Sequence, residues 1–262
     1  MIFDTHAHYD AEQFDADRHA LLAALPARGV GLVVDPGCDE RSCRAALEIA
    51  ERYPFVWAAV GWHPEEWESW TGESMACLRE LARHERVVAI GEIGLDYYWD
   101  TGHKPLQKEM LERQINLALQ LGLPVIIHDR EAHGDCLEMI ARYPELRGVF
   151  HCFSGSAEMA AELLRRGWYL GFDGPVTYKN NKKAAQVLAV TPVDRILVET
   201  DSPYMAPQPV RGRRNDSGNL PWVIEKIAEL KGLTSAEIER LTWENGCRLF
   251  GLTEDGKERR QT

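Results

Sequence analysis

The stretch Val87-Val-Ala-Ile-Gly-Glu92 decides the fold, because a short apolar run ends directly at a potential metal ligand. Val87–Ile90 predicts a strand buried on both faces, since it shows no alternation with polar residues. Comparable apolar runs precede the other ligand-type residues, which are His6, His8, His128, His151 and Asp201. Side chains at the carboxyl ends of successive parallel strands converge on one mouth. The sequence therefore predicts a single site assembled from distant segments.

Strand-like and helix-like segments alternate along the whole chain. The predicted strands are Ile2–Asp4, Gly31–Asp35, Val56–Val60, Val87–Ile90, Val125–His128, Val149–His151, Tyr169–Phe172 and Ile196–Glu199. The predicted helices are Asp17–Arg28, Glu40–Arg52, Ser74–His84, Pro105–Leu121, Gly134–Tyr143, Ser156–Arg166, Asn181–Ala189, Leu220–Lys231 and Ser235–Phe250. Eight β–α steps within 262 residues predict an α/β fold, the (β/α)8 TIM barrel.

A single domain is expected, because no linker rich in proline, glycine or serine interrupts the alternation. We place the barrel over residues 1–252 and a charged C-terminal tail over residues 253–262. The alternative of two packed domains is disfavoured on the same ground.

Composition narrows the class of protein. Charged residues make up 27% and hydrophobic residues 45% of the chain, as in ordinary globular proteins. No segment approaches the roughly 18 uninterrupted apolar residues of a membrane span, and the start lacks the features of a secretion signal. We therefore expect a cytoplasmic protein with no membrane association, whose six cysteines are reduced thiols. The net charge of −11 is opposite in sign to that of a general duplex-DNA binder.

Two imidazoles lie two residues apart in Asp4-Thr-His6-Ala-His8. On an extended chain both point to the same side, so one cation can bind both. Glu92 follows the fourth predicted strand, where its two carboxylate oxygens can bridge two cations. Taken one at a time, the histidines can equally be polar loop residues, and Glu92 a salt-bridged carboxylate at the rim.

The remaining ligand candidates also follow predicted strands. His128 and His151 stand at equivalent positions after the fifth and sixth strands, which favours ligands over buried core histidines. Asp201 follows the eighth strand and can bind a metal or accept a proton from water, although an Asx-turn before Pro203 is the alternative. Glu199 is expected to orient a ligating residue without binding the metal itself. Cys152 is left out, because strand alternation points it away from His151.

Imidazoles and carboxylates together suit Zn, Mn, Fe or Co. Two cations on a shared carboxylate lower the pKa of bridging water and stabilise displacement at phosphorus. The same groups can hydrolyse an amide or an ester. Three functions therefore stay open: a phosphodiesterase acting on nucleic acid, a hydrolase of a small amide, ester or lactone, and a noncatalytic metal-binding protein.

Six motifs in order from residue 3 to residue 215 resemble those of the TatD-family metal-dependent deoxyribonucleases, a branch of the amidohydrolase-like barrels. The motifs are Phe3-Asp-Thr-His-Ala-His8, Gly61-Trp-His-Pro64, Gly91-Glu-Ile-Gly-Leu-Asp-Tyr-Tyr98, His128-Asp-Arg-Glu-Ala132, His151-Cys-Phe-Ser-Gly155, and Glu199-Thr-Asp-Ser-Pro-Tyr204 with Arg211-Gly-Arg-Arg-Asn215.

The resemblance implies one or two divalent ions, Mg, Mn or Zn, and hydrolysis of DNA in the 3′→5′ direction from single-stranded ends. It implies one metal site at His6, His8, Glu92 and Asp201, and a second at Glu92, His128 and His151. Catalysis would rest on Asp201 and Glu92. Substrate contacts would come from His63, Arg130, Arg211 and Asn215. DNA, preferably single-stranded, would be the substrate, and no obligate protein partner is expected.

Two positions depart from the family pattern. Asp216-Ser-Gly-Asn follows Asn215, where the family usually has an acidic residue and a proline. Trp99 stands where an arginine is common after the tyrosine pair. If relatives contact phosphate at that position, this chain offers an aromatic surface in place of a charge.

Overall fold

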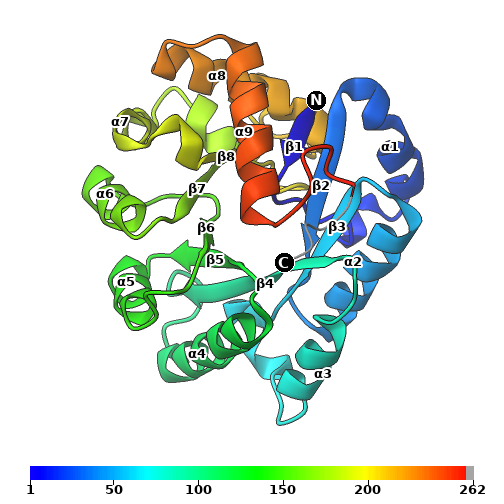
Figure 1. Cartoon of the computed structure of the whole chain (residues 1–262), viewed down its shortest axis with the longest axis vertical. Helices are drawn as coiled ribbons and strands as arrows, with labels where there is room; N and C mark the ends of the chain where they lie inside the picture. Colours follow the sequence, from blue (N-terminus) through cyan, green and yellow to red (C-terminus); the bar gives the residue numbers. More distant parts are fainter. Residues whose placement is uncertain (258–262) are drawn as a thin grey trace.

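Eight parallel strands in sequence order form one sheet that curls into a ring, and helices surround it (Figure 1). The structure is a computed structural model that describes residues 1–257; residues 258–262, the end of the predicted tail, lie outside the described residues. The strands are β1 (Ile2–Asp4), β2 (Val30–Pro36), β3 (Val56–Val60), β4 (Val87–Asp96), β5 (Val125–Arg130), β6 (Gly148–Phe150), β7 (Tyr169–Phe172) and β8 (Ile196–Val198). The predicted (β/α)8 barrel is confirmed.

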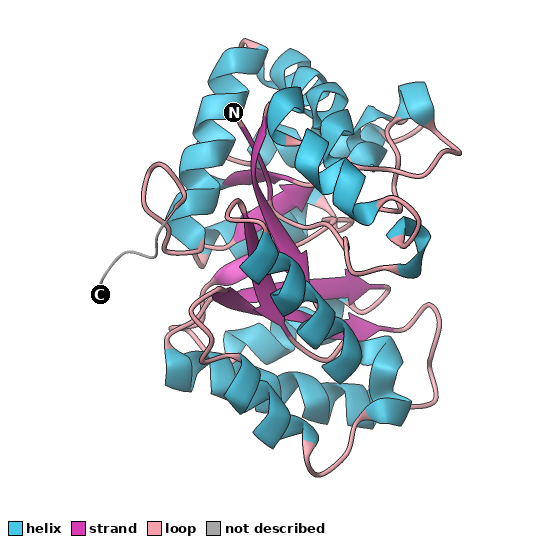
Figure 2. Ribbon diagram, turned by 90° about the vertical axis from the view of Figure 1, so that its right-hand side faces the viewer, coloured by secondary structure: helices cyan, strands magenta, loops and turns pink. Residues whose placement is uncertain are grey.

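Helices form the outer layer around the strands (Figure 2). They are α1 (Arg18–Ala24), α2 (Glu40–Arg52), α3 (Ser74–Leu81), α4 (Lys104–Leu121), α5 (His133–Ala141), α6 (Ala157–Arg165), α7 (Lys182–Val190), α8 (Leu220–Lys231) and α9 (Ser235–Leu249). Within residues 1–257, none of them is both long enough and apolar enough to cross a membrane.

Two predicted elements differ from the structure by more than three residues at one end. The helix predicted over Asp17–Arg28 ends at Ala24, and a short 3₁₀ helix follows over Pro26–Arg28, because Pro26 has no backbone N–H to continue the helical hydrogen bonds. Strand β4 runs on to Asp96 rather than ending at Ile90, since its pairing with β5 resumes after an irregularity and continues to Asp96 opposite Arg130.

The ring closes between β8 and β1. The Thr5 amide donates to the Val198 carbonyl at 3.1 Å, and Ala7 forms an isolated parallel bridge with Ser202. The segments that carry His6, His8 and Asp201 therefore lie side by side, although almost two hundred residues separate them in sequence.

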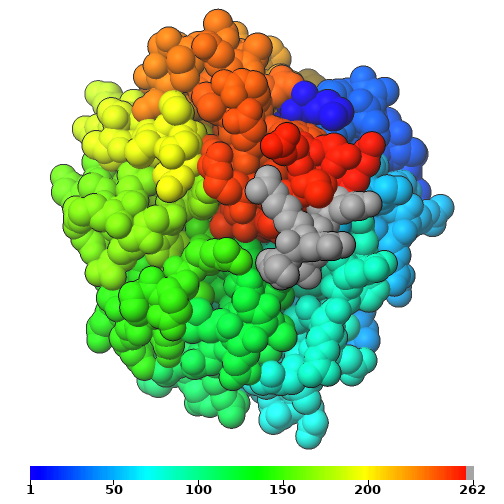
Figure 3. All heavy atoms as spheres, in the orientation of Figure 1, coloured from blue at the N-terminus to red at the C-terminus, as the bar shows by residue number. Residues whose placement is uncertain are grey.

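One end of the barrel is filled by the C-terminal segment. Phe3, Leu32 and Trp57 form a buried cluster with Phe250 and Leu252, which follow α9. Figure 3 shows this face, with α9 and residues 250–257 lying across it.

The first residues of the predicted tail pack against the same end. The Trp57 indole N–H donates to the Gly256 carbonyl at 3.1 Å, and the Trp243 indole N–H donates to the Glu254 carbonyl at 2.8 Å. The base of the barrel is thus covered, and the open mouth lies at the carboxyl ends of the strands.

Candidate metal centre

A cavity of about 1050 Å³ opens at the carboxyl ends of the strands. Five of the six predicted metal ligands line it, namely His8, Glu92, His128, His151 and Asp201. The sixth, His6, is fully buried directly beneath them, with its Nε2 atom 3.1 Å from the Nε2 atom of His8. All six side chains therefore meet in one place, as the sequence predicts.

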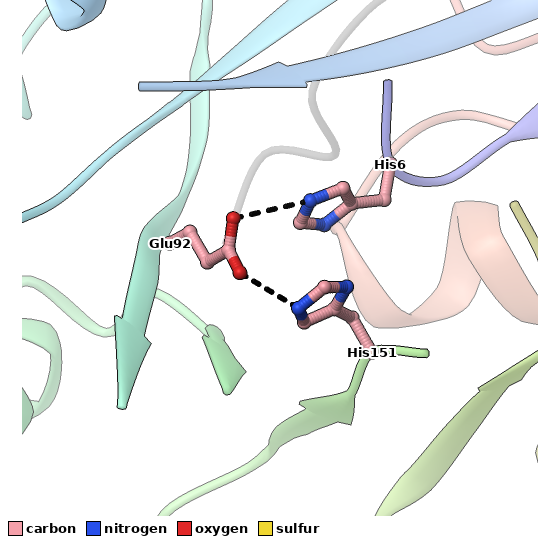
Figure 4. Close-up of side chains that lie close together, drawn as sticks. All are labelled: His6, Glu92 and His151. Carbon is pink, nitrogen blue, oxygen red and sulfur yellow. Dashed lines mark ion pairs between the residues drawn. The ribbon is translucent and has the colours of Figure 1, made fainter. Parts of the chain in front are cut away.

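Glu92 stands at the centre of this cluster, with each carboxylate oxygen facing a different group of histidines. Oε2 lies 3.3 Å from His6 Nε2 and 3.4 Å from His8 Nε2. Oε1 lies 2.7 Å from His151 Nε2 and 2.9 Å from His128 Nδ1. Figure 4 shows the carboxylate between His6 and His151, with one oxygen directed at each ring. This is the arrangement that a bridging carboxylate requires.

Asp201 completes the group around His6 and His8. Its Oδ1 atom lies 3.7 Å from His6 Nε2 and 3.6 Å from His8 Nε2. The Nδ1 atom of His8 lies 3.0 Å from the Pro36 carbonyl, so this nitrogen carries the proton and leaves the lone pair of Nε2 facing the cluster.

Asp4 ties the two ends of the ring together beneath these ligands. Its carboxylate accepts hydrogen bonds from the Thr200 amide at 3.0 Å and from the Thr200 hydroxyl at 2.7 Å. Its Oδ1 atom also accepts from the His6 amide at 3.3 Å. Asp4 thereby fixes the segment that carries His6 and His8 against the segment that carries Asp201.

Asp96 is a supporting residue that the sequence reasoning missed. Its Oδ2 atom lies 3.0 Å from His128 Nε2, on the opposite side of the ring from Glu92. A carboxylate behind a ligating histidine fixes the tautomer and orientation of the ring. The available signal was its place in Gly91-Glu-Ile-Gly-Leu-Asp96, at the end of the strand that carries Glu92.

Glu199 takes the supporting position expected of it. It is fully buried and accepts a hydrogen bond from the Cys152 amide, and its Oε1 atom lies 3.8 Å from His151 Nδ1. Gly171 leaves the necessary space, because a Cβ atom there would lie 2.4 Å from a Glu199 carboxylate oxygen.

Electrostatics in the cluster favour ionised carboxylates. Burial raises the pKa of Glu92, but the surrounding imidazoles of His151, His6 and His63 outweigh it and leave the pKa well below the ordinary value. Burial also raises the pKa of Asp201, and the neighbouring His8 ring, whose Nε2 atom lies 3.6 Å from Asp201 Oδ1, is the largest effect that lowers it. Burial lowers the pKa of His128, yet Asp96 and Glu92 raise it to about 10. In His6, burial and the charge of His151 lower the pKa to about 4.

The donor set fits divalent cations. Ring nitrogens of His6 and His8 face each other at 3.1 Å, and those of His128 and His151 face each other at 3.2 Å. Such contacts between imidazoles are compensated when the lone pairs point at a shared cation. Groups of three donors that can hold an ion include His6, Glu92 and His151, and also His6, His8 and Asp201.

Two cysteines border the site. Cys38, which the sequence reasoning did not select, forms a further donor group with His8 and Glu92. Cys152 lines the cavity rather than pointing away from it, because strand β6 ends at Phe150 and Cys152 has a φ of 42°, so strand alternation does not apply. None of the six cysteines forms a disulfide.

His63 and Arg130, two of the predicted substrate contacts, line the same cavity. The Nδ1 atom of His63 accepts a hydrogen bond from the Glu65 amide at 3.2 Å. Burial and the charge of His128 lower the pKa of His63 to about 3. The neutral ring therefore carries its proton on Nε2, which lies 3.6 Å from Glu92 Oε1.

The other two predicted contacts lie elsewhere. Arg211 lines an adjoining pocket of about 480 Å³ that shares Gln13, Tyr204 and Met205 with the main cavity. Asn215 is fully buried and lines neither pocket. Its amide donates to the Thr200 carbonyl at 3.0 Å, and its oxygen accepts from the Asp216 amide and the Asn219 side chain. In the structure Asn215 therefore holds the loop after β8 by hydrogen bonds and does not reach the cavity.

A barrel that gathers four imidazoles and two carboxylates at the carboxyl ends of its strands has the architecture of a metal-dependent hydrolase. The chain belongs to the family of TatD-related DNases, whose family model matches residues 3–251. The resemblance carried by the sequence motifs is thereby confirmed, and the protein is a metal-dependent hydrolase of that family.

The similarity to individual relatives extends over nearly the whole length of each protein. The uncharacterized metal-dependent hydrolase YabD of Bacillus subtilis is 46% identical, covering 96% of this chain and 100% of that protein. The 3′-5′ ssDNA/RNA exonuclease TatD of Cronobacter sakazakii is 36% identical over 95% of this chain and 97% of that protein. The crystal structure of YjjV, a TatD homologue from Escherichia coli, is 32% identical, covers 96% of this chain and 98% of that chain, and superposes with a TM-score of 0.91.

Proposed function

We propose that this chain is a divalent-metal-dependent deoxyribonuclease that removes nucleotides in the 3′→5′ direction from single-stranded DNA ends in the cytoplasm. The observation that carries the proposal is the position of Glu92, whose two oxygens face two separate groups of histidines at the floor of a deep cavity. Two cations spaced by one carboxylate suit in-line displacement at phosphorus. One or two ions of Mg, Mn or Zn are the proposed cofactor.

The proposed ligands form two groups that share Glu92. One comprises His6, His8, Glu92 and Asp201, and the other comprises Glu92, His128 and His151. When bound, the cations supply Lewis-acid activation of water and offset negative charge on the leaving 3′ oxygen. Asp201 accepts the proton of the attacking water, because its carboxylate is ionised and lies at the edge of the cluster beside the cavity.

His63 and Arg130 hold the scissile phosphate in this proposal. His63 presents its Nε2–H toward the cavity, next to Glu92. The Arg130 guanidinium has no carboxylate within 4.0 Å among residues 1–257, so its charge is free to pair with a phosphate. Arg211, in the adjoining pocket, is suited to a phosphate further along the strand.

Single strands are the preferred substrate for two reasons. The net charge of −11 disfavours a long duplex lying across the surface. A recessed cluster also admits a flexible strand end more readily than a rigid double helix. The relative named as a 3′-5′ ssDNA/RNA exonuclease supports this choice of substrate.

The experiment is digestion of labelled oligonucleotides by protein that has been freed of metal and then reloaded with Mg, Mn or Zn in turn. We expect stepwise shortening from the 3′ end of single strands, and little cutting of circular single strands or intact duplex. Glu92→Gln and Asp201→Asn should each abolish turnover, whereas the matched control Glu68→Gln, at an exposed position outside the cavity, should retain it. Turnover of small amides, esters or lactones without digestion of any oligonucleotide would overturn the proposal.

A further inference from the structure

Two large aromatic side chains stand exposed where β4 ends, at the rim of the cavity. Tyr98 is 56% exposed and Trp99 is 64% exposed, and Trp99 lines the cavity. Their rings lie 4.7 Å apart between centroids, edge to face. Adjacent exposed aromatics are uncommon on a folded protein, because they leave apolar surface in water, and they indicate a binding surface.

Arg130, from the end of β5, packs on the same two rings. Its guanidinium carbon lies 4.1 Å from the Tyr98 ring centroid and 5.3 Å from the Trp99 ring centroid. Cation–π contact holds the flat guanidinium in place without a carboxylate partner. The three side chains therefore combine aromatic faces with an available positive charge at one edge of the metal centre.

Asp96 connects this aromatic turn rigidly to the metal centre. Its Oδ1 atom accepts hydrogen bonds from the amides of Tyr98 at 2.9 Å and Trp99 at 3.0 Å, while its Oδ2 atom faces His128. The Gln107 side chain bonds both the amide and the carbonyl of Asp96, at 2.9 Å and 3.0 Å. One buried carboxylate thus sets the distance between the aromatic turn and the proposed ligands.

Two other aromatics of the same rim, Trp62 and Tyr97, do not offer such a face. Trp62 is only 3% exposed, and its indole N–H donates to Ser69. Tyr97 is partly buried, and its hydroxyl donates to Asp135 at 2.6 Å. Both belong to the packing of the barrel rim.

We propose that Trp99, packed at right angles to Tyr98, forms a stacking platform for one unpaired base next to the scissile phosphodiester, and that Arg130 contacts the scissile phosphate. The inference rests on the proposed nuclease function and names what that site recognises. A base in a duplex has both faces covered by its neighbours, so only a frayed or single-stranded nucleotide can stack on the platform. Stacking uses the π-face that every base has, and the platform should accept all four bases.

The test compares normal oligonucleotides with oligonucleotides that lack the base at one of the last three nucleotides. In the unmodified protein, one of these abasic positions should lower kcat/KM by about 5- to 150-fold, the range expected for one stacked base. In Trp99→Ala the same base removal should change kcat/KM by less than about 2-fold, because the base no longer has a partner. Trp99→Phe should restore most of the effect, and Trp222→Ala, an exposed tryptophan on α8, should behave like the unmodified protein.

A binding measurement gives a readout that does not depend on turnover. Metal-free protein should quench the fluorescence of 2-aminopurine placed at the sensitive position, and Trp99→Ala should lose this quenching. The platform is overturned if the unmodified protein cuts normal and abasic strands with equal kcat/KM. It is also overturned if Trp99→Ala lowers kcat/KM for normal and for abasic strands to the same extent. In those cases digestion of oligonucleotides would still support the nuclease, whereas an absence of digestion with every metal would overturn both proposals.

Discussion

At the scale of single residues, the cluster is organised by carboxylates whose two oxygens serve different neighbours. Glu92 faces His6 and His8 with one oxygen and His128 and His151 with the other. Asp96 bonds the amides of the aromatic turn with one oxygen and faces His128 with the other. The geometry of the site is therefore set by a few buried acids rather than by the histidines alone.

Asp96→Asn should weaken metal binding by about 10- to 100-fold, the usual effect of losing a carboxylate behind a ligating histidine. The new amide oxygen can still accept from the amides of the aromatic turn, but its NH₂ group then faces His128 Nε2 and favours the wrong tautomer. Competition with a chelating dye measures the affinity. The control is Asp100→Asn, which removes a nearby carboxylate that pairs with His103. Equal affinities in the two variants would show that Asp96 does not orient His128.

Glu65 should make substrate binding dependent on pH near neutrality. Partial burial and the charge of Asp96 raise the pKa of Glu65, an exposed residue at the cavity mouth, to about 7, so this carboxyl is neutral below that pH and negative above it. Its charge then opposes a phosphodiester near Arg130, and KM should rise about 2- to 5-fold between pH 6 and pH 8. Initial rates across this range measure the effect.

In Glu65→Gln the rise in KM with pH should disappear, since the amide does not ionise. Glu12→Gln, which removes another carboxylate lining the cavity, is the matched control and should keep the pH dependence. A rise in KM that persists in Glu65→Gln would assign the titration to a different group.

The six ligand candidates could be predicted because each follows a short apolar run, a local pattern that needs no tertiary information. Asp96 stands in the same motif as Glu92, but its role and that of Cys38 could not be predicted, because they depend on which side chains lie behind or beside the ligands. Asn215 shows the opposite difference between motif and position. Its motif suggested a substrate contact. A side-chain amide can both donate and accept hydrogen bonds, however, so it is equally suited to holding a buried loop, and this is its place in the structure.

At the scale of elements, the pairing of β4 with β5 sets the distance between Glu92 and His128. The sequence predicted both strands but ended β4 at Ile90, because the glycines at positions 91 and 94 read as a turn. Gly94 instead lies within β4 opposite His128, with a φ of 157°. A Cβ atom at this position would lie 1.9 Å from the His128 carbonyl oxygen, so only glycine allows the two strands to approach.

Gly94→Ala should lower the free energy of unfolding by about 3 kcal/mol or more, because the added methyl group meets rigid backbone and the residue cannot adopt its φ without strain. Metal affinity should fall with it, since His128 moves away from Glu92. Urea denaturation measures the first effect and dye competition the second. Gly134→Ala, in helix α5 with no atom within 4 Å of the new methyl group, should leave both unchanged or raise stability slightly. A Gly94→Ala protein as stable as this control would contradict the role given to Gly94.

At the scale of the whole molecule, a covered base and an open mouth follow from one feature of the topology. The C-terminal segment fills the amino ends of the strands, so every ligand-bearing segment is left free at the other end. The eightfold alternation could be predicted from sequence. The packing of residues 253–257 against the base could not, because their composition is that of a polar tail, whereas the contacts that hold them include hydrogen bonds from the Trp57 and Trp243 indoles.

Net charge limits how this protein can bind DNA, because an acidic protein must do so through few contacts. The net charge is −11, and the arginines assigned to phosphates are Arg130 in the cavity and Arg211 in the adjoining pocket. We therefore expect only about two phosphates to be neutralised by side chains. For single strands the logarithm of the affinity then falls with the logarithm of salt concentration with a slope of about −1.4. Binding of a noncleavable oligonucleotide between roughly 50 and 300 mM KCl, at fixed metal concentration, measures the slope. Arg130→Ala should make it shallower by about 0.7, while Arg52→Ala, on helix α2 outside the cavity, should not change it. A slope of about −4 or steeper would mean that a basic surface other than this mouth holds the strand.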